Sequence, residues 1–209
     1  MRGTTEGAAM VSAVVLAAGR ASRMGEEKLL LFLDGQPVIR HVVETVARAG
    51  LLETLVVVNP RNRDAIADAL PDASARLVCN ARFHDGIATS IAAGTAAVCE
   101  TSQAMMLLQG DQPLVTTDML LALVDAWQGS RPAFVAASYD GLTTTPVLFS
   151  RALYPELRGL EGDVGAREVL RRHAGQTLEF PAWTGGDLDT RADYEALRKT
   201  WSARRQIVA

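Results

Sequence analysis

LAAGRASRMGEEK, residues 16–28, begins at the end of the short apolar run 13–16, and these two segments decide how the chain is organised. The run is β-branched and bounded by small residues, so it predicts a buried strand. The small side chains of residues 17–19 leave the backbone open to a ligand. Three cations, Arg20, Arg23 and Lys28, follow within nine residues. A strand that runs into such a turn suits a polyanion such as a triphosphate; the alternative is a surface loop with solvated cations.

Two common phosphate-binding loops do not fit this stretch. A Walker loop needs a glycine, four residues, and then Gly-Lys followed by Ser or Thr. Here five residues separate Gly19 from Gly25, and Glu26 follows. The dinucleotide fingerprint G-x-G-x-x-G fails at its second glycine, where the chain has Ala21.

Apolar runs of strand length alternate with helical patterns through the first 130 residues. This alternation predicts an α/β fold with a mostly parallel sheet, right-handed crossovers and helices on both faces, which is a Rossmann-like three-layer α/β/α sandwich. The expected strands are 13–16, 54–58, 75–79 and 104–108, and the expected helices are 37–49, 62–70, 87–99 and 117–127.

Asp111 follows the apolar run 104–108 and precedes Pro113. Ligands of such sheets bind at the carboxyl ends of the strands. The loop 16–28 and Asp111 both lie at such ends, so they can face one site although they are far apart in sequence. A carboxylate beside phosphates suits Mg²⁺, and the alternative is an aspartate that only caps its turn.

The second half of the chain has shorter elements. Strands are expected at 133–137, 146–149 and 177–180, with a polar turn over 139–145. Helical patterns cover 151–157 and 165–173, and a final helix begins near Ala192 and frays from residue 203. No linker divides the chain, so residues 1–10 are expected to be a disordered tail and residues 11–203 a single domain.

Composition excludes several classes of protein. The net charge of -3 argues against a broad nucleic-acid surface, and no apolar run is long enough to span a membrane. Cys79 and Cys99 are too few for a metal knuckle and lie in apolar surroundings. They are expected to be buried thiols of a cytoplasmic protein.

The stretch 16–28 resembles the signature L-A-x-G-x-S-x-R-M-G-x-x-K of the MobA-like nucleotidyltransferases. It matches at Leu16, Ala17, Gly19, Ser22, Arg23, Met24, Gly25 and Lys28. The resemblance implies a fold of the nucleotide-diphospho-sugar transferase type in which residues 16–19, Arg23 and Lys28 bind the nucleotide. Alanine at the third position, here Ala18, is typical of the branch that makes molybdopterin cytosine dinucleotide, whereas guanylyl-transferring relatives tend to have glycine there. Ala18 therefore favours CTP.

Two acidic segments resemble the family's metal-binding motifs. Gly110-Asp111-Gln112-Pro113 matches G-D-x-P. Residues 187–194, DLDTRADY, resemble D-[IVL]-D-T-P-E-D-[YL], with Arg191 and Ala192 at the proline and glutamate positions. The resemblance implies that Asp111 and Asp189 hold Mg²⁺, with Asp189 chosen over Asp187. It also makes Arg23, Lys28 and Asp111 the catalytic residues and adds Gly110 to the nucleotide site.

Residues 80–94, NARFHDGIATSIAAG, resemble the segment N-x-x-[WF]-x-x-G-[ML]-x-x-S-[IL]-x-x-G. The resemblance implies that Asn80, Gly86 and Ser90 belong to the nucleotide site. Gly86 would let the backbone pass close to the base. Ser90 would bond a pyrimidine edge; the alternative is a helical serine bonded to its own backbone.

Two further segments resemble the cytidylyltransferase branch on its acceptor side. Residues 146–149 match the end of G-H-P-V-L-F, and residues 162–167 match G-D-x-G-A-R. Thr144 and Thr145 stand where that branch has Gly-His. Thr145 and Arg167 are the candidate acceptor contacts, and Arg167 could equally be a solvated helix residue.

The resemblance implies a Mg²⁺-dependent enzyme that transfers CMP from CTP to a phosphorylated acceptor, molybdopterin, with release of pyrophosphate, and that has a molybdoenzyme as possible partner. Thr144 and Thr145 favour the first alternative, another acceptor such as a sugar or alcohol phosphate. The second alternative is an oxidoreductase, against which the lack of G-x-G-x-x-G counts. The third is a cofactor chaperone, which would not need both Asp111 and Asp189.

Overall fold

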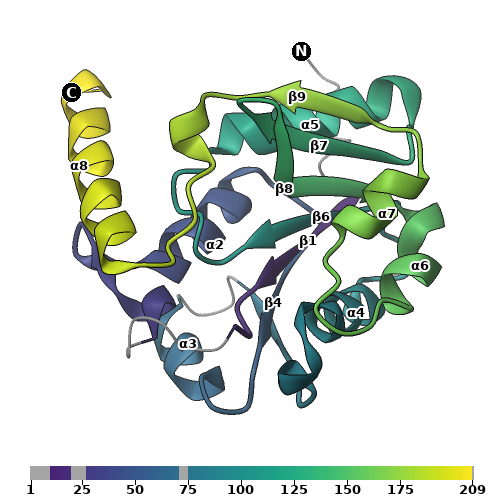
Figure 1. The fold of residues 1–209 in the computed structure, drawn as a ribbon, viewed down its shortest axis with the longest axis horizontal. Coiled ribbons are helices and arrows are strands. Elements are labelled where there is room, and N and C mark those ends of the chain that lie inside the picture. Colours follow the sequence, from purple (N-terminus) through teal and green to yellow (C-terminus); the bar gives the residue numbers. More distant parts are fainter. Residues whose placement is uncertain (1–9, 20–26, 71–74, 209) are drawn as a thin grey trace.

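The computed structural model describes residues 10–19, 27–70 and 75–208, with side chains described as far as residue 203. Seven strands form one sheet in the order β5-β4-β1-β6-β8-β7-β9 (Figure 1). A separate hairpin joins β2 (Phe32–Leu33) to β3 (Gln36–Pro37). In sheet order the seven strands are β5 (Arg76–Cys79), β4 (Glu53–Val58), β1 (Val11–Leu16), β6 (Ala104–Gln109), β8 (Leu142–Ser150), β7 (Phe134–Tyr139) and β9 (Gln176–Glu179). Among them β8 alone runs antiparallel to its neighbours, so the predicted mostly parallel α/β fold is confirmed.

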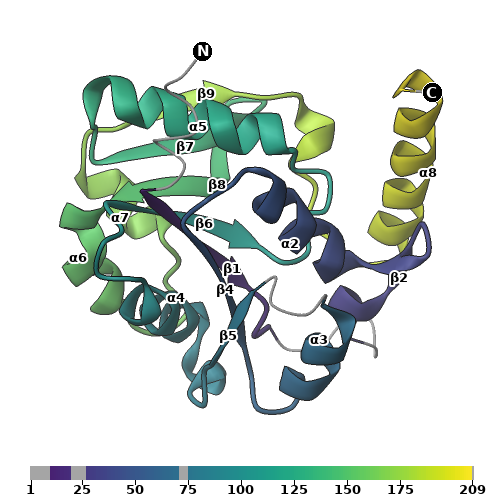
Figure 2. The same ribbon diagram turned by 180° about the vertical axis from the view of Figure 1, so that it is seen from behind.

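Helices cover both faces of this sheet, as the views from the two sides show (Figures 1 and 2). One face carries α2 (Val38–Arg48), α3 (Arg63–Ala69) and α5 (Thr117–Ser130). The other face carries α4 (Ile87–Ala97), α6 (Tyr154–Arg158) and α7 (Arg167–Arg172). Successive side chains of β1 alternate between the two cores, with Val15 on the α2 side and Val14 on the α4 side. Because both faces are buried, the strand is continuously apolar.

The strand order reverses between β1 and β6. From β1 the chain moves outward to β4 and β5, and then returns to β6 on the other side of β1. The ends of β1 and β6 are tied together, since the Gly110 N–H donates to the Leu16 carbonyl at 2.9 Å. In an α/β sheet such a switch point opens a crevice at the carboxyl ends of the strands. The fold therefore places the loop after β1 and Asp111 at one crevice, as the sequence predicts.

The expected polar turn over 139–145 is shorter in the structure. Asp140 and Gly141 alone make the turn, with φ of 49° and 77°. Positive φ at both central residues is the type I′ pattern, which matches the twist of the flanking strands. Residues 142–145 therefore belong to β8, and they bring Thr145 into the sheet.

The last helix, α8 (Arg191–Val208), stands beside the main body (Figure 1) and runs beyond residue 203, where fraying was expected. Its first turns are anchored by Tyr194 and Leu197, which pack against Leu33 and Leu114. No helix within the described ranges is both long and apolar enough to cross a membrane. Of the predicted tail, only Met10 lies among the described residues.

The expectation that both thiols are buried was wrong. Cys79 is exposed and Cys99 is half-buried. Cys79 is the last residue of β5, which among the described strands lies at the edge of the sheet and has no fully buried residue. Cys99 lies beyond the end of α4.

Gly94 lets α4 approach the sheet closely. A Cβ at this position would lie 2.4 Å from Val14 Cγ1 and 3.0 Å from Val57 Cγ2. We expect Gly94→Ala to lower the free energy of unfolding by about 1–3 kcal/mol, because overpacking outweighs the gain in helix propensity. The control is Gly129→Ala in α5, where a Cβ would meet nothing within 4 Å. That change should stabilise by up to about 1 kcal/mol in urea unfolding, and equal stabilisation of both variants would contradict the close packing.

Candidate active site

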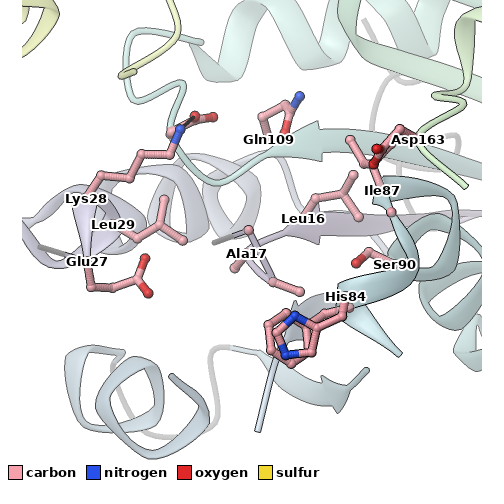
Figure 3. A pocket seen from close by; sticks show the side chains of 15 residues that line it. Leu16, Ala17, Glu27, Lys28, Leu29, His84, Ile87, Ser90, Gln109 and Asp163 are labelled. Atoms are coloured by element: carbon pink, nitrogen blue, oxygen red, sulfur yellow. Dashed lines mark hydrogen bonds and ion pairs between the residues drawn. The ribbon is translucent and has the colours of Figure 1, made fainter. Parts of the chain in front are cut away.

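A cleft of about 560 Å³ lies at the carboxyl ends of β1 and β6. Lys28 and Glu27 lie at one end of it, and Ser90, Ile87 and Asp163 lie at the other (Figure 3). The predicted site residues that line it are Leu16, Ala17, Ala18, Gly19, Lys28, Gly86, Ser90 and Asp111. Segments from four separate regions of the sequence, the last of them around Asp163, thus meet at the crevice. Arg23 and the rest of residues 20–26 lie outside the described residues.

Lys28 joins two acidic residues at one end of the cleft. Its Nζ lies 2.5 Å from Asp111 Oδ2 and 2.9 Å from Asp189 Oδ1. Burial by itself would lower the pKa of Lys28, but the charges and hydrogen bonds of the two carboxylates outweigh burial and raise it. Lys28 is therefore a firmly held cation, and the two predicted metal-binding acids converge on its ammonium group.

The two carboxylates fit a divalent cation. Asp111 is buried, and its second oxygen, Oδ1, meets no hydrogen-bond donor in the described part of the chain. A buried carboxylate oxygen without a partner is costly, and a cation would relieve that cost. No group of three or more acidic, histidine or cysteine side chains among the described residues could hold a metal. A cation here would have two carboxylates and complete its shell with water and phosphate oxygens, as Mg²⁺ does.

Asp187 has a different partner from Asp189. Its Oδ1 accepts a hydrogen bond from Gln112 Nε2 at 2.7 Å, and Gln112 Oε1 accepts one from Thr145 Oγ1 at 2.8 Å. Burial of the carboxyl group raises the pKa of Asp187, and the charge of Asp111 raises it further, although much of the residue is exposed. The structure thus separates the two acids, with Asp189 on Lys28 and Asp187 on Gln112.

The start of α8 fixes the backbone of Asp189. Asp193 Oδ2 accepts from the N–H of Asp189 at 3.2 Å and from the N–H of Thr190 at 2.7 Å. Hydrogen bonds from Thr190 and the neighbouring backbone lower the pKa of Asp193 and keep it ionised. The helix start therefore holds Asp189 in place, while Tyr194 in the next turn packs into the core.

At the other end of the cleft, Asn80 holds the first turn of α4. Its Nδ2 donates to Thr89 Oγ1 and to Ser90 Oγ, each at 2.9 Å. Asn80 itself does not line the cleft, so it reaches the predicted nucleotide site only through Ser90. In the described structure the Ser90 hydroxyl does not bond its own helix backbone, in contrast to Thr95, which donates to the Ile91 carbonyl at 2.7 Å. Ser90 lines the cleft, and its hydroxyl hydrogen is available to donate there.

Gly86 is required by a neighbouring loop. Its φ is +105°, and a Cβ would lie 2.1 Å from the Gly162 carbonyl oxygen. The expected close passage of the base stays a prediction, and the structure adds a second reason for glycine here, the close passage of residues 162–163. That approach brings Asp163 into the cleft, although its segment resembles one on the acceptor side.

The remaining predicted residues, Gly110, Thr145 and Arg167, do not line the cleft. Gly110 packs beneath the site, because a Cβ there would lie 2.9 Å from Ile39 Cδ1 and 3.1 Å from the Leu16 carbonyl. Thr145 reaches the site through Gln112. Arg167 is exposed at the start of α7 and does not line the cleft. Sequence reasoning missed Glu27, which no motif singled out, and Asp163, whose segment 162–167 was expected on the acceptor side.

Comparisons with known proteins give relatives over the same region. The purine catabolism protein PucB of Bacillus subtilis is 30% identical over 202 residues, which cover 90% of this chain and 96% of that protein. The bifunctional protein GlmU of Symbiobacterium thermophilum is 33% identical over 189 residues, but the chain spans only 39% of its length.

A crystal structure of Rv0371c from Mycobacterium tuberculosis superposes with a TM-score of 0.82, at 27% identity, over 91% of this chain and 98% of that one. The same protein has been solved in complex with manganese. The model of the MobA-like NTP transferase domain matches residues 13–177, which run from β1 through the loop after it, β6 and Asp111 to β9. This match contains β1, β6 and Asp111, and PucB matches over nearly its whole length. The chain therefore belongs to the family of MobA-like NTP transferase domains.

Proposed function

We propose that this chain, a nucleotidyltransferase by family, transfers CMP from CTP to molybdopterin and releases pyrophosphate. The observation that carries the proposal is the meeting of Asp111, Asp189 and Lys28 beside the open backbone of residues 17–19. Two carboxylates and an ammonium group next to an exposed small-residue loop suit a metal-bound triphosphate. The chain would act in the cytoplasm and pass its product to a molybdoenzyme.

In the proposed reaction an acceptor phosphate oxygen forms a bond to the α-phosphorus of CTP. The bond from that phosphorus to the bridging oxygen breaks, and pyrophosphate leaves with the electron pair. A phosphate monoester is already an anion, so the site needs no general base. Its task is to bring anions together and to stabilise charge on the leaving oxygens.

The proposed roles of the residues follow from that task. Lys28 and Arg23 neutralise triphosphate charge. Asp111 and Asp189 hold Mg²⁺, which supplies further charge neutralisation at the phosphate oxygens when it is bound. Gln112 is aligned by Asp187 and Thr145, so these residues form the acceptor end of the site.

Two residues support a preference for CTP. Ala18 lines the cleft at the position where the cytidylyl-transferring branch has alanine. Ser90 Oγ accepts from Asn80, which leaves the hydroxyl hydrogen free to donate. The N3 and O2 atoms of cytosine are acceptors, so such a donor suits a pyrimidine edge.

A second candidate function is transfer to another phosphorylated acceptor, such as a sugar or alcohol phosphate. Thr145 favours it, because this residue stands where the molybdopterin branch has histidine and its hydroxyl is engaged by Gln112. The hydroxyl of Thr145 and the amide of Gln112 present different hydrogen-bonding groups from a histidine imidazole, so they suit a chemically different acceptor.

The test is pyrophosphate release with Mg²⁺, comparing CTP with GTP, each with and without molybdenum-loaded molybdopterin. We expect release only when both CTP and the pterin are present. Release with CTP and a sugar or alcohol phosphate instead would overturn the pterin assignment and keep the transferase. Release with GTP would overturn the preference for CTP.

A further inference from the structure

Two asparagines lie behind the loop that follows β1. Asn59 and Asn62 come from the turn after β4 and are 3% and 5% exposed. Neither lines the cleft. Local sequence gives them only as turn residues around Pro60, since asparagine before proline is typical of a turn.

The two side chains lock each other in one orientation. Asn59 Oδ1 accepts from the N–H of Arg61 at 2.8 Å and from that of Asn62 at 3.0 Å. Asn62 Oδ1 accepts from the Asn59 N–H at 3.0 Å. Only the oxygen of a side-chain amide can accept, so both Nδ2 groups are directed outward as donors.

These donors reach three consecutive carbonyl groups of the loop. Asn62 Nδ2 donates to the Ala17 carbonyl at 2.8 Å, and Asn59 Nδ2 lies 3.3 Å from each of the Ala18 and Gly19 carbonyls. Because a trans peptide is planar, the N–H that follows each carbonyl points the opposite way. The N–H groups of Ala18 and Gly19 therefore point away from the asparagines, and both residues line the cleft. Neither meets a protein acceptor within the described ranges.

The same pair reaches the residue before the catalytic lysine. Asn62 Nδ2 also lies 3.3 Å from Glu27 Oε2. Lys28 follows Glu27 and contacts both metal-binding acids. One buried side chain thus ties the small-residue loop to the segment that carries Lys28.

We propose that Asn59 and Asn62 are positioning residues for the triphosphate. They hold the carbonyls of residues 17–19 away from the cleft, so that backbone N–H groups meet the phosphates, and they fix Glu27 and hence the start of the Lys28 segment. This proposal rests on the proposed function in one respect, that the ligand is a nucleoside triphosphate. It does not depend on which base the nucleotide carries, because the backbone N–H groups recognise the phosphates.

The experiment is calorimetric titration of the full chain with Mg²⁺-CTP, Mg²⁺-GTP and Mg²⁺-tripolyphosphate. We expect Asn59→Ala and Asn62→Ala each to weaken binding of CTP and of tripolyphosphate about tenfold, because a buried hydrogen bond to the loop is lost. The double variant should lose less than the product of the single losses, since the two side chains act as a unit. In steady-state assays the KM for nucleotide should rise while the KM for the acceptor stays unchanged.

Ser12→Ala is the matched control. Ser12 is also buried and donates to Glu53 Oε1 at 2.9 Å, but it lies at the opposite end of β1. It should lose stability comparable to the asparagine variants, yet bind both probes within about twofold of wild type. Asparagine variants that bind as tightly as this control would overturn the proposal.

Asn59→Asp serves if the alanine variants do not fold. It keeps the oxygen that accepts from Arg61 and Asn62 but removes the donors to Ala18 and Gly19. Unchanged affinity in this variant overturns the proposal, and weaker binding of both probes supports it. Wild-type protein that binds none of the three probes overturns both this proposal and the proposed function. Wild-type protein that prefers GTP overturns only the preference for CTP, and the asparagines are then judged on GTP and tripolyphosphate.

Discussion

Replacing Asp111 with asparagine should lower the turnover of nucleotidyl transfer by about three orders of magnitude. The variant removes one negative charge from the point where Asp111, Lys28 and Asp189 meet. It also converts the unpartnered buried oxygen or its neighbour into an amide nitrogen, which cannot ligate Mg²⁺. Steady-state pyrophosphate release at saturating CTP measures the loss directly.

The same variant should leave the fold intact. Asparagine has the shape of aspartate, and Lys28 keeps its contact with Asp189 at 2.9 Å. A partly buried ion pair contributes little net stability, because desolvation offsets the attraction. We expect the free energy of unfolding to change by less than about 2 kcal/mol in urea titration. A large loss of stability would mean that Asp111 is structural.

Asp163→Asn is the matched control for Asp111. It removes the same charge from the same cleft, but at the end away from Lys28 (Figure 3). Its turnover should fall by less than about tenfold, since Lys28 joins Asp111 and Asp189 at the opposite end of the cleft. Equal losses in the two variants would indicate a general effect of cleft charge, and wild-type activity in Asp111→Asn would end the metal assignment.

The sequence predicted the fold and the position of the cleft because both depend on local patterns. Alternating strands and helices specify the sheet, and strand ends specify where residues 16–28 and Asp111 meet. The segment 142–145 was missed because its threonines are polar, yet β-branched residues suit a strand once the Asp140-Gly141 turn sets the pairing. The pairing set by this short turn, with its two positive φ values, therefore decided that residues 142–145 form a strand despite their polarity.

The contacts that support the cleft could not be read from the sequence. Asn59 and Asn62 carry only a turn signal, and their partners lie some forty residues earlier in the chain. Gly86 was singled out for close passage of the base, but the group that excludes a side chain there is the Gly162 carbonyl, from a distant loop. Such contacts depend on how loops cross at the carboxyl edge of the sheet, and local propensity does not encode that.

The spacing of Asp187 and Asp189 in the sequence does not predict that their side chains point the same way. Two residues apart in an extended strand, the acids would point the same way. Residues 186–189 have no regular secondary structure, and the two carboxylates bond different partners. The choice of Asp189 as the second metal ligand rested on resemblance. It can be tested by comparing the Mg²⁺ requirement of Asp189→Asn with that of Asp187→Asn.

Asp189→Asn should lower turnover about a hundredfold and raise the Mg²⁺ concentration needed for half-maximal activity about tenfold. Asp189 shares Lys28 with Asp111, so the two carboxylates lie together where we propose that the metal binds. Asp187→Asn should lower turnover by less than about tenfold and leave the Mg²⁺ requirement unchanged. Asparagine at 187 keeps the oxygen that accepts from Gln112, so the acceptor end of the site stays aligned.

A Mg²⁺ titration of the two variants decides between the acids. If Asp187→Asn, and not Asp189→Asn, shifts the Mg²⁺ requirement, the ligand is Asp187, and Gln112 must release it when the metal binds. If neither variant shifts it, Asp111 holds the cation with water and phosphate oxygens alone. A shift in Asp189→Asn alone would give the bond between Gln112 and Asp187 a separate purpose. Burial and the charge of Asp111 raise the pKa of Asp187, and the hydrogen bond from Gln112 opposes them by stabilising the carboxylate, which it holds apart from Asp189 and Lys28.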